Sequence, residues 1–110
     1  MERLKQRADF LAAAKGARVP AGPFVLQSRA RGDAGPARFG FTVSRKVGTA
    51  VERNRVRRRL REIVRRNAAV IAQNGHDYVL IGRRAALAMP FDEMTTEFVG
   101  ALARLSRGRR

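Results

Sequence analysis

The sequence contains no cysteine, which excludes a disulfide scaffold, a thiolate metal site and a cysteine nucleophile. It has one histidine, His76, so neither a two-histidine metal site nor a Ser–His catalytic pair is available. No apolar run approaches the roughly 18 residues of a membrane span, and no hydrophobic signal core follows residues 1–7. We therefore expect a cytoplasmic protein with no membrane partner.

Acidic residues are also scarce, because 9 Asp and Glu face 24 Lys and Arg, a net charge of +15 on 110 residues. The acids are scattered, and no two have the local spacing of a catalytic carboxylate pair or a metal loop. We therefore predict no catalytic residue and no metal ligand in the protein. Self-repulsion on this scale opposes compaction and indicates an anionic partner, for which nucleic acid is the first candidate.

The sequence predicts one domain over residues 1–110, with flexible ends at about 1–6 and 107–110. Apolar periodicity and breakers predict six elements: a helix over 8–15, strands over 24–28 and 39–44, a long helix between Thr49 and Asn74, a strand over 77–82, and a last helix from Pro90 to near Gly108. The two strands around the turn at 31–36 are expected to pair as an antiparallel hairpin. The order α-β-β-α-β-α predicts an α/β (α+β) two-layer sandwich with a small central sheet.

The long helix concentrates the charge: between Ser44 and Arg66, ten basic residues and two acids give a net +8. A Thr49–Glu52 capping box begins this helix. Its predicted apolar stripe is Val56, Leu60, Ile63, Val64 and Ile71. The arginines form two surfaces: a row bordering the stripe, made of Arg53, Arg57, Arg61 and Arg65, and a set farther round toward solvent, made of Arg55, Arg58, Arg59 and Arg66.

An ordinary solvated helix would need acids three or four positions from these arginines, and only Glu52 and Glu62 are available. An anionic membrane surface is another partner for a basic amphipathic helix. Such helices usually carry Trp, Phe or Leu on the apolar face, whereas this stripe is mainly Val and Ile. The pattern therefore favours a nucleic-acid backbone, bound with strong salt dependence.

Residues 39–62, FGFTVSRKVGTAVERNRVRRRLRE, closely resemble the signature of the bacterial ribonuclease P protein component, and the likeness extends over about residues 3–105. The Ser-basic-Lys-Val-Gly approach, the Arg-Asn-Arg tripeptide and the Arg-rich turn stand in the family's order. The resemblance implies a subunit of the endonuclease that removes the 5′ leader from precursor tRNA, in which the RNA subunit with Mg²⁺ carries the chemistry. It also implies a left-handed β-α-β crossover, a connection that general topology rules disfavour.

The same resemblance implies two groups of site residues, matched position by position. Contacts with the catalytic RNA are expected from Ser44, Arg45, Lys46, Arg53, Asn54, Arg55, Arg58 and Arg59. Contacts with the single-stranded leader are expected from Phe10, from the exposed face of the first strand at Val25 and Gln27, and from Arg57 and Arg61. Ala14 and Gln27 stand where the family often has aromatic residues, which predicts weaker stacking of leader bases.

The expected partners are therefore the catalytic RNA and the precursor tRNA leader, and not DNA. A ribosomal-type structural RNA-binding protein with no part in processing is the alternative, because the same basic helix would serve it. An autonomous nuclease is disfavoured by the shortage of acids and histidine.

Overall fold

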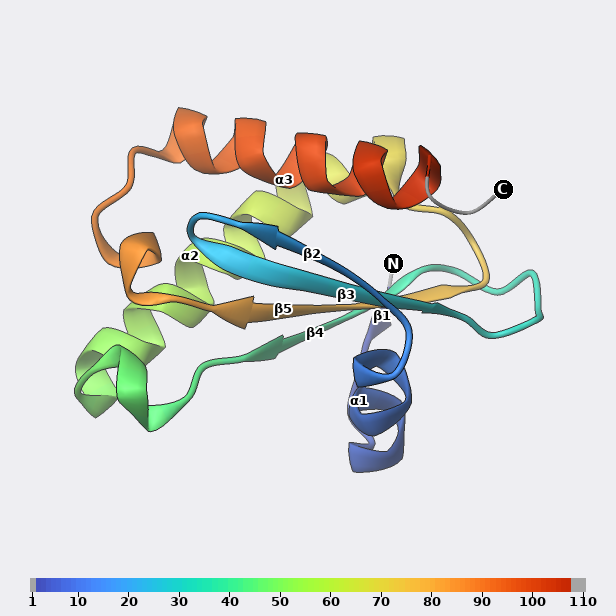
Figure 1. The fold of residues 1–110 in the computed structure, drawn as a ribbon, viewed down its shortest axis with the longest axis horizontal. Coiled ribbons are helices and arrows are strands. Elements are labelled where there is room, and N and C mark those ends of the chain that lie inside the picture. The colour runs from blue at the N-terminus through green and yellow to red at the C-terminus, as the bar shows by residue number, and fades with distance from the viewer. Residues whose placement is uncertain (1, 108–110) are drawn as a thin grey trace.

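The computed structural model describes residues 2–107, without the side chains of residues 68–71 and 107. In chain order the elements are β1 Glu2–Arg3, α1 Arg7–Ala14, β2 Ala17–Ala21, β3 Phe24–Ala30, β4 Arg38–Thr42, η1 Arg45–Val47, α2 Ala50–Ile71, β5 His76–Gly82, η2 Arg84–Leu87 and α3 Phe91–Arg107. The strands form one sheet in the order β1-β4-β5-β3-β2 (Figure 1). None of the described helices is long and apolar enough to cross a membrane.

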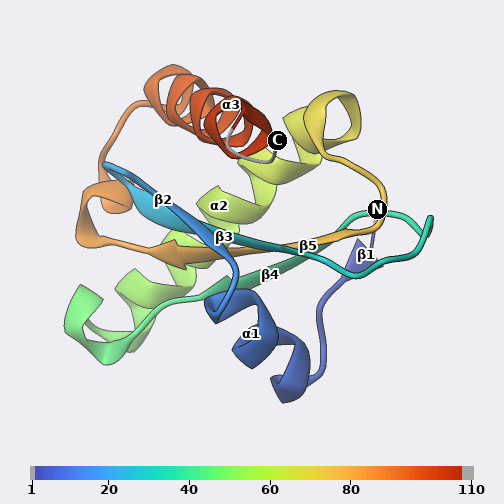
Figure 2. The same cartoon turned by 45° about the vertical axis from the view of Figure 1, so that its right-hand side comes forward.

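Helices lie on both faces of the sheet (Figure 2). α2 and α3 pack on one face, where the core includes Phe24, Leu26 and Leu80 from the strands. The side chains of a strand alternate between faces, so the intervening residues point the other way, and Val79 is buried there against Ala13 of α1. The predicted sandwich of sheet and helices is confirmed, and α1 adds cover to part of the second face.

β3 and β4, which we predicted to pair as a hairpin, do not touch as neighbours. β5 lies between them, antiparallel to β3 and parallel to β4, so that Val79 faces Gln27 on one side and Gly40 on the other. Alternation in a sequence predicts which residues share a face but does not identify the neighbouring strand. The hairpin prediction is therefore wrong, and the segment 31–37 is a connection between strands on opposite sides of β5.

The actual hairpin joins β3 to β2, a strand that the sequence did not predict. Pro20, Gly22 and Pro23 made this stretch resemble a turn. Pro20 is tolerated because β2 is an edge strand, where a missing N–H costs no ladder hydrogen bond on the open side. Gly22 has a positive φ of 21° and lies in the tight connection.

The N-terminal residues also join the sheet. β1 runs parallel to β4, with Glu2 opposite Arg38, and Leu4 is only 7% exposed. The sequence did not predict this strand, because its pattern is too short to indicate one; flexibility of residues 1–6 stays a prediction. Of residues 107–110, also predicted to be flexible, Arg107 is the last residue of α3, and residues 108–110 lie outside the described residues.

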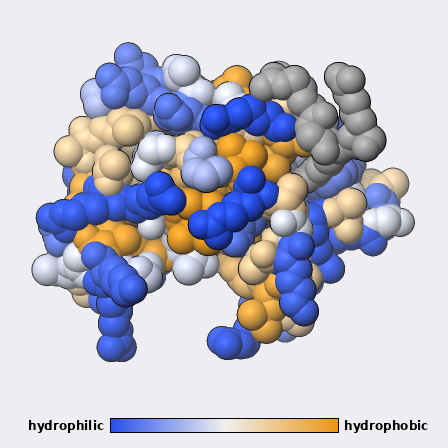
Figure 3. Space-filling model, in the orientation of Figure 1, coloured by the Kyte–Doolittle hydropathy of each residue, from blue (hydrophilic) through white to orange (hydrophobic). Residues whose placement is uncertain are grey.

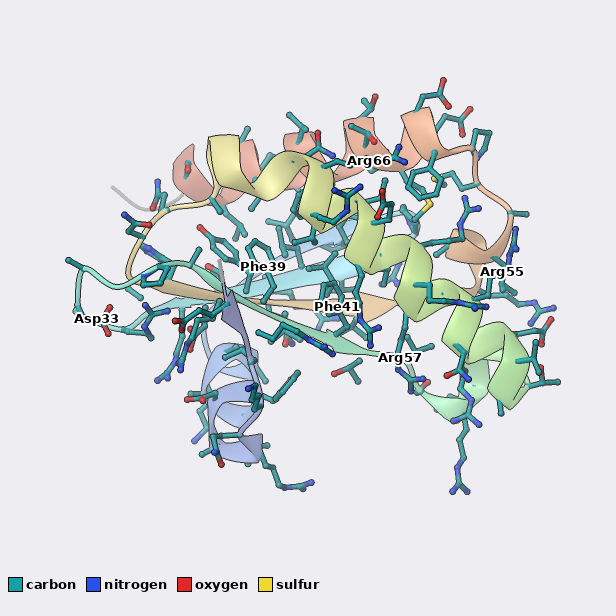
Figure 4. The ribbon with its side chains drawn as sticks, turned by 180° about the vertical axis from the view of Figure 1, so that it is seen from behind. Asp33, Phe39, Phe41, Arg55, Arg57 and Arg66 are labelled. Carbon is teal, nitrogen blue, oxygen red and sulfur yellow. The ribbon has the colours of Figure 1, made fainter. Side chains whose placement is uncertain are left out.

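The connection from β4 through α2 to β5 joins adjacent parallel strands. With α2 in front, as in Figure 4, these strands point to the right and β5 lies above β4. This is the left-handed crossover that the resemblance implied, opposite in hand to nearly all such connections. It lays α2 obliquely across the sheet, with its first turns extending past the end of β4 (Figure 4).

A buried ion-pair network holds the opposite end of the sheet. Asp77, fully buried in β5, accepts hydrogen bonds from Arg31 and Arg38 at 2.7 Å each and from Arg29 at 3.2 Å. Asp9 of α1 accepts a further bond from Arg29 at 3.0 Å. Burial raises the pKa of Asp77, but the three arginines lower it more, so this pKa lies below its ordinary value. The network thus holds α1 and the strand ends together around a carboxylate that is ionised at neutral pH.

Candidate nucleic-acid interface

The N-terminus of α2 is set by the predicted capping box. The Thr49 hydroxyl accepts from the Glu52 N–H at 3.1 Å, and the Glu52 carboxylate accepts from the Thr49 N–H at 3.0 Å. Arg84 of η2 pairs with Glu52 at 3.2 Å and donates to the Val47 carbonyl at 2.7 Å. The Thr49 N–H and then Arg84 lower the pKa of Glu52, so the cap stays ionised and the η1 turn is held against the helix.

The inner side of α2 is the predicted apolar stripe. Val56, Leu60, Ile63 and Val64 are at most 2% exposed and pack on the sheet. The side chain of Ile71, the fifth predicted member, lies outside the described residues. Burial of this stripe determines which arginines of the helix face outward and which face its neighbours.

Part of the predicted solvent-facing arginine set packs against η2 and α3 instead. Arg55 donates to the Leu87 carbonyl at 3.1 Å, and Arg59 donates to the Met89 carbonyl. The guanidinium groups of Arg59 and Arg66 lie 5.0 and 5.2 Å from the ring centre of Phe91, within cation–π range. The sequence pattern missed this because it does not show that α3 packs beside α2. Of that set, only Arg58 has no partner among the described residues.

Glu62 neutralises two further arginines on the outer side of α2. It accepts from Arg65 Nε at 2.9 Å and from Arg66 Nε at 2.7 Å. These two hydrogen bonds lower the pKa of Glu62 to about 2. The acid therefore stays ionised at neutral pH and competes with any bound polyanion for both arginines.

We predict that Glu62→Gln strengthens binding of RNA, because it releases Arg65 and Arg66 and removes a negative charge. The expected gain is roughly two- to fivefold at low salt and is lost at high salt. Filter binding across a salt titration measures it, with Glu93→Gln on exposed α3 as the control for the same charge change. Equal gains from both variants would show that only net charge matters.

The arginines left over define the free basic surface of α2. Arg53, Arg58 and Arg61 have no hydrogen-bond or ion-pair partner within residues 2–107, and Arg57 has only Asn54, whose amide oxygen accepts at 2.8 Å. A hollow of about 410 Å³, here called the Arg58 hollow, is lined by Val51, Asn54, Arg57, Arg58 and Arg61. Arg45 and Lys46 of η1 are exposed nearby in the chain and are likewise unpaired in the described structure. Figure 4 shows Arg57 beside the end of β4 and Arg55 on the side toward η2.

A second hollow, of about 360 Å³, lies between α1 and β4 and is here called the Phe10 hollow. It is lined by Lys5, Arg7, Phe10, Phe41 and Thr42. Phe10 lies so close to Gly40 that a Cβ added to that glycine would be 2.5 Å from the ring. Figure 3 shows a recess in the surface between two projections, one at α1 and one at the η1 end of α2. Half-buried Phe10 therefore forms part of an open wall with basic groups beside it.

Val25 and Gln27 were predicted on an exposed strand face, and that exposure is wrong. Their side chains point to the α1 side of the sheet but are only 3% and 6% exposed. β3 has neighbours on both sides, β5 and β2, which the predicted hairpin did not include. Phe41 and Thr42 of β4, which the prediction left out, line the Phe10 hollow in their place. The short β1 strand leaves this part of β4 at the sheet edge.

Carboxylates do not gather in this interface. Within residues 2–107, no three His, Cys, Asp or Glu side chains come together in a way that would hold a metal ion. A neighbouring hollow of about 540 Å³ mixes Glu2 and Asp9 with Arg3, Lys5 and Arg38, so it presents no uniform positive surface. The basic side chains along η1, α2 and the Phe10 hollow are therefore complementary in charge to a polyanion.

Comparisons with known proteins agree with this geometry. A family model described as Ribonuclease P matches residues 1–106. The ribonuclease P protein component of Gluconacetobacter diazotrophicus is 50% identical, covering 96% of this chain and 88% of its own length, and that of Ruegeria pomeroyi is 48% identical, covering 93% and 84%. Among solved structures, the RNase P protein of Thermotoga maritima has a TM-score of 0.79 at 35% identity, covering 94% of this chain and 97% of its own. The Staphylococcus aureus protein has a TM-score of 0.79 at 28% identity, covering 96% and 95%.

Proposed function

Because the chain belongs to the ribonuclease P protein family, we propose that it binds the catalytic RNA of ribonuclease P and the 5′ leader of precursor tRNA. The observation that supports this best is the set of unpaired arginines on α2, Arg53, Arg58 and Arg61, together with the Phe10 hollow. A structural RNA-binding role alone would need the basic surface but not the hollow beside it.

The catalytic RNA is proposed to contact η1 and the outward side of α2. The residues assigned to it are Ser44, Arg45, Lys46, Arg53, Asn54, Arg55 and Arg58. Arg55 remains exposed and retains N–H groups that Leu87 does not use. Arg59 is half-buried against Phe91 and Met89, so we assign it to holding α3 on α2 rather than to RNA.

The leader is proposed to lie across the Phe10 hollow toward α2. Phe10 and Phe41 provide apolar surface, while Arg57 and Arg61 provide charge for the phosphates. Val25 and Gln27 support this surface from below, because they are too buried to stack bases.

Hydrolysis of the leader is proposed to depend on Mg²⁺ held chiefly by the RNA subunit. The described residues bring together no carboxylate cluster that would hold the ion, which supports this assignment. The metal would supply the activated water, and the residues of this chain bind and orient RNA. Their positive charge also reduces repulsion between the two RNAs, which lowers the Mg²⁺ concentration needed for assembly.

Reconstitution tests the proposal. Adding the protein to a bacterial ribonuclease P RNA at low Mg²⁺ is expected to increase cleavage of precursor tRNA and to strengthen its binding relative to mature tRNA. Sequencing of RNA that co-purifies with the protein separates the alternative, which predicts ribosomal RNA as the dominant partner. Unchanged cleavage in the reconstituted reaction would reject the processing role.

A leader-specific variant is the next prediction. Phe10→Leu combined with Arg57→Gln is expected to reduce the preference for leader-bearing over mature tRNA roughly tenfold or more, because it removes an aromatic surface and a phosphate contact. Equilibrium binding of the reconstituted holoenzyme to both tRNAs measures it, and Arg104→Gln on exposed α3 is the control for charge loss. Equal weakening for both tRNAs would contradict the assignment.

A further inference from the structure

A further hollow, here called the Val64 hollow, lies between β4 and α2. It has a volume of about 190 Å³ and is lined by Glu2, Arg3, Phe39, Phe41, Arg61, Val64 and Arg65. Figure 4 shows Phe39 and Phe41 of β4 lying beneath α2. None of the roles assigned above uses this space.

The walls of the Val64 hollow are almost wholly apolar, and its rim is basic. Phe41 is half-buried and Val64 is 2% exposed, so the hollow ends on core side chains. A cavity of roughly 150 Å³ lined by apolar side chains accommodates benzene, so this hollow accommodates one aromatic ring. The walls offer few hydrogen-bonding groups. They therefore select a ring by its shape and not by the donors and acceptors on its edge.

The charges around the rim indicate what kind of molecule the bound ring belongs to. Arg3 and Arg61 have no hydrogen-bond or ion-pair partner from their side chains within the described residues. Arg65 is paired with Glu62, and Glu2 is the single acid in the lining. An apolar slot with unpaired cations beside it is complementary to a nucleotide, whose ring is flat and whose phosphates are negative.

The hollow is also continuous with both proposed RNA surfaces. Phe41 lines the Phe10 hollow as well as the Val64 hollow, and Arg61 lines the Arg58 hollow as well as the Val64 hollow. A strand running from Phe10 to the basic surface of α2 therefore passes the mouth of the Val64 hollow.

We propose that the Val64 hollow receives one unstacked base of the single-stranded leader, with the ring against Phe41 and Val64 and the adjoining phosphates on Arg3 and Arg61. This assignment rests on the proposed function, since it requires the leader to cross β4. The volume suits a single-ring pyrimidine better than a purine. The site adds binding energy at one leader position and little base-specific hydrogen bonding.

A scan of abasic leaders tests the proposal in the reconstituted holoenzyme. Precursor tRNAs lacking one leader base at a time are expected to bind normally except at one position, where affinity falls roughly tenfold. Val64→Phe fills the hollow without changing charge, and with this variant the loss at that position should disappear. Val99→Met, which adds bulk on exposed α3, should keep the wild-type profile.

Photocrosslinking of the unmodified chain decides the same question if Val64→Phe does not fold. A leader with 4-thiouridine at the sensitive position is expected to crosslink to the peptides containing Phe41 or Val64. Crosslinks confined to Phe10 or to residues 53–58, or a flat abasic profile with intact leader preference, would overturn the base site while leaving the proposed function standing. Loss of all leader preference in the wild-type holoenzyme would instead reject the proposed function.

Discussion

Asp77→Ala is expected to reduce the free energy of unfolding by about 3–5 kcal/mol, because it removes the buried carboxylate that Arg31 and Arg38 share at the end of the sheet. Asp77 is 0% exposed, and without it Arg31 and Arg38, whose side chains are mostly buried, keep only the more exposed carboxylates of Asp33 and Asp9. Domains of this size are stable by only about 5–15 kcal/mol, so the loss is a large share of the total. Urea denaturation measures the change.

Asp33→Ala is the matched control for this substitution. Asp33 also pairs with Arg31, at 3.0 Å, but its side chain is 55% exposed, so solvent screens the pair and little stability should be lost. Equal destabilisation by the two variants would show that burial of the Asp77 network is not what matters.

The stability contributed by Asp77 should depend on pH in a definite direction. Burial alone would raise its pKa, but hydrogen bonds from Arg38, Arg31 and Arg29 bring it below the ordinary value of 3.8. A carboxyl whose pKa is lower in the folded state stabilises the fold above the unfolded pKa, and this contribution disappears as pH falls through the folded pKa. Unfolding measured from pH 7 to pH 3 should therefore show a steeper loss below about pH 4 for the wild type than for Asp77→Ala.

The second large effect is expected from Arg53→Gln combined with Arg58→Gln. Both side chains lack partners in the described structure, so their removal costs the protein no intramolecular ion pair. Charge-assisted contacts to phosphate are worth about 1.5–3 kcal/mol each, so affinity for the catalytic RNA should fall roughly a hundredfold or more. The slope of log affinity against log salt should decrease in magnitude by about two.

Arg18→Gln combined with Arg104→Gln removes the same charge from exposed positions on β2 and α3. This pair should change affinity only slightly and leave the salt slope nearly intact. If both double variants weakened binding equally, net charge rather than the position of the arginines on α2 would explain recognition of RNA.

The sequence predicted local structure better than pairing. The Thr49–Glu52 cap and the stripe from Val56 to Val64 were correct because both depend on neighbours within one helix. Pairing of β3 with β5 depends on residues about 50 positions apart, and alternation carries no information on that choice. β2 was missed because Pro20 argues against a strand in the sequence, although an edge strand tolerates a proline that a central strand excludes.

The same lack of information on tertiary contacts explains what the sequence could not predict about the candidate interface. Arg55 and Arg58 look equivalent in the sequence, but Arg55 donates to Leu87 while Arg58 has no partner in the described structure. Only the position of η2 and α3 beside α2 separates an arginine with an intramolecular partner from one without. Phe41 packs against the core, and the open edge of β4, which the sequence does not show, also places it at two hollows.

The central place of β5 in the sheet has a consequence for synthesis on the ribosome. β4 emerges first, and so does α2 with its arginines, but the strand that separates β4 from β3 is complete only at Gly82. Until then the nascent chain has the β2–β3 hairpin and a basic helix with no sheet beneath its apolar side. The proposed RNA-binding surface can therefore be complete only after Gly82, about three quarters of the way along the chain, has left the ribosome.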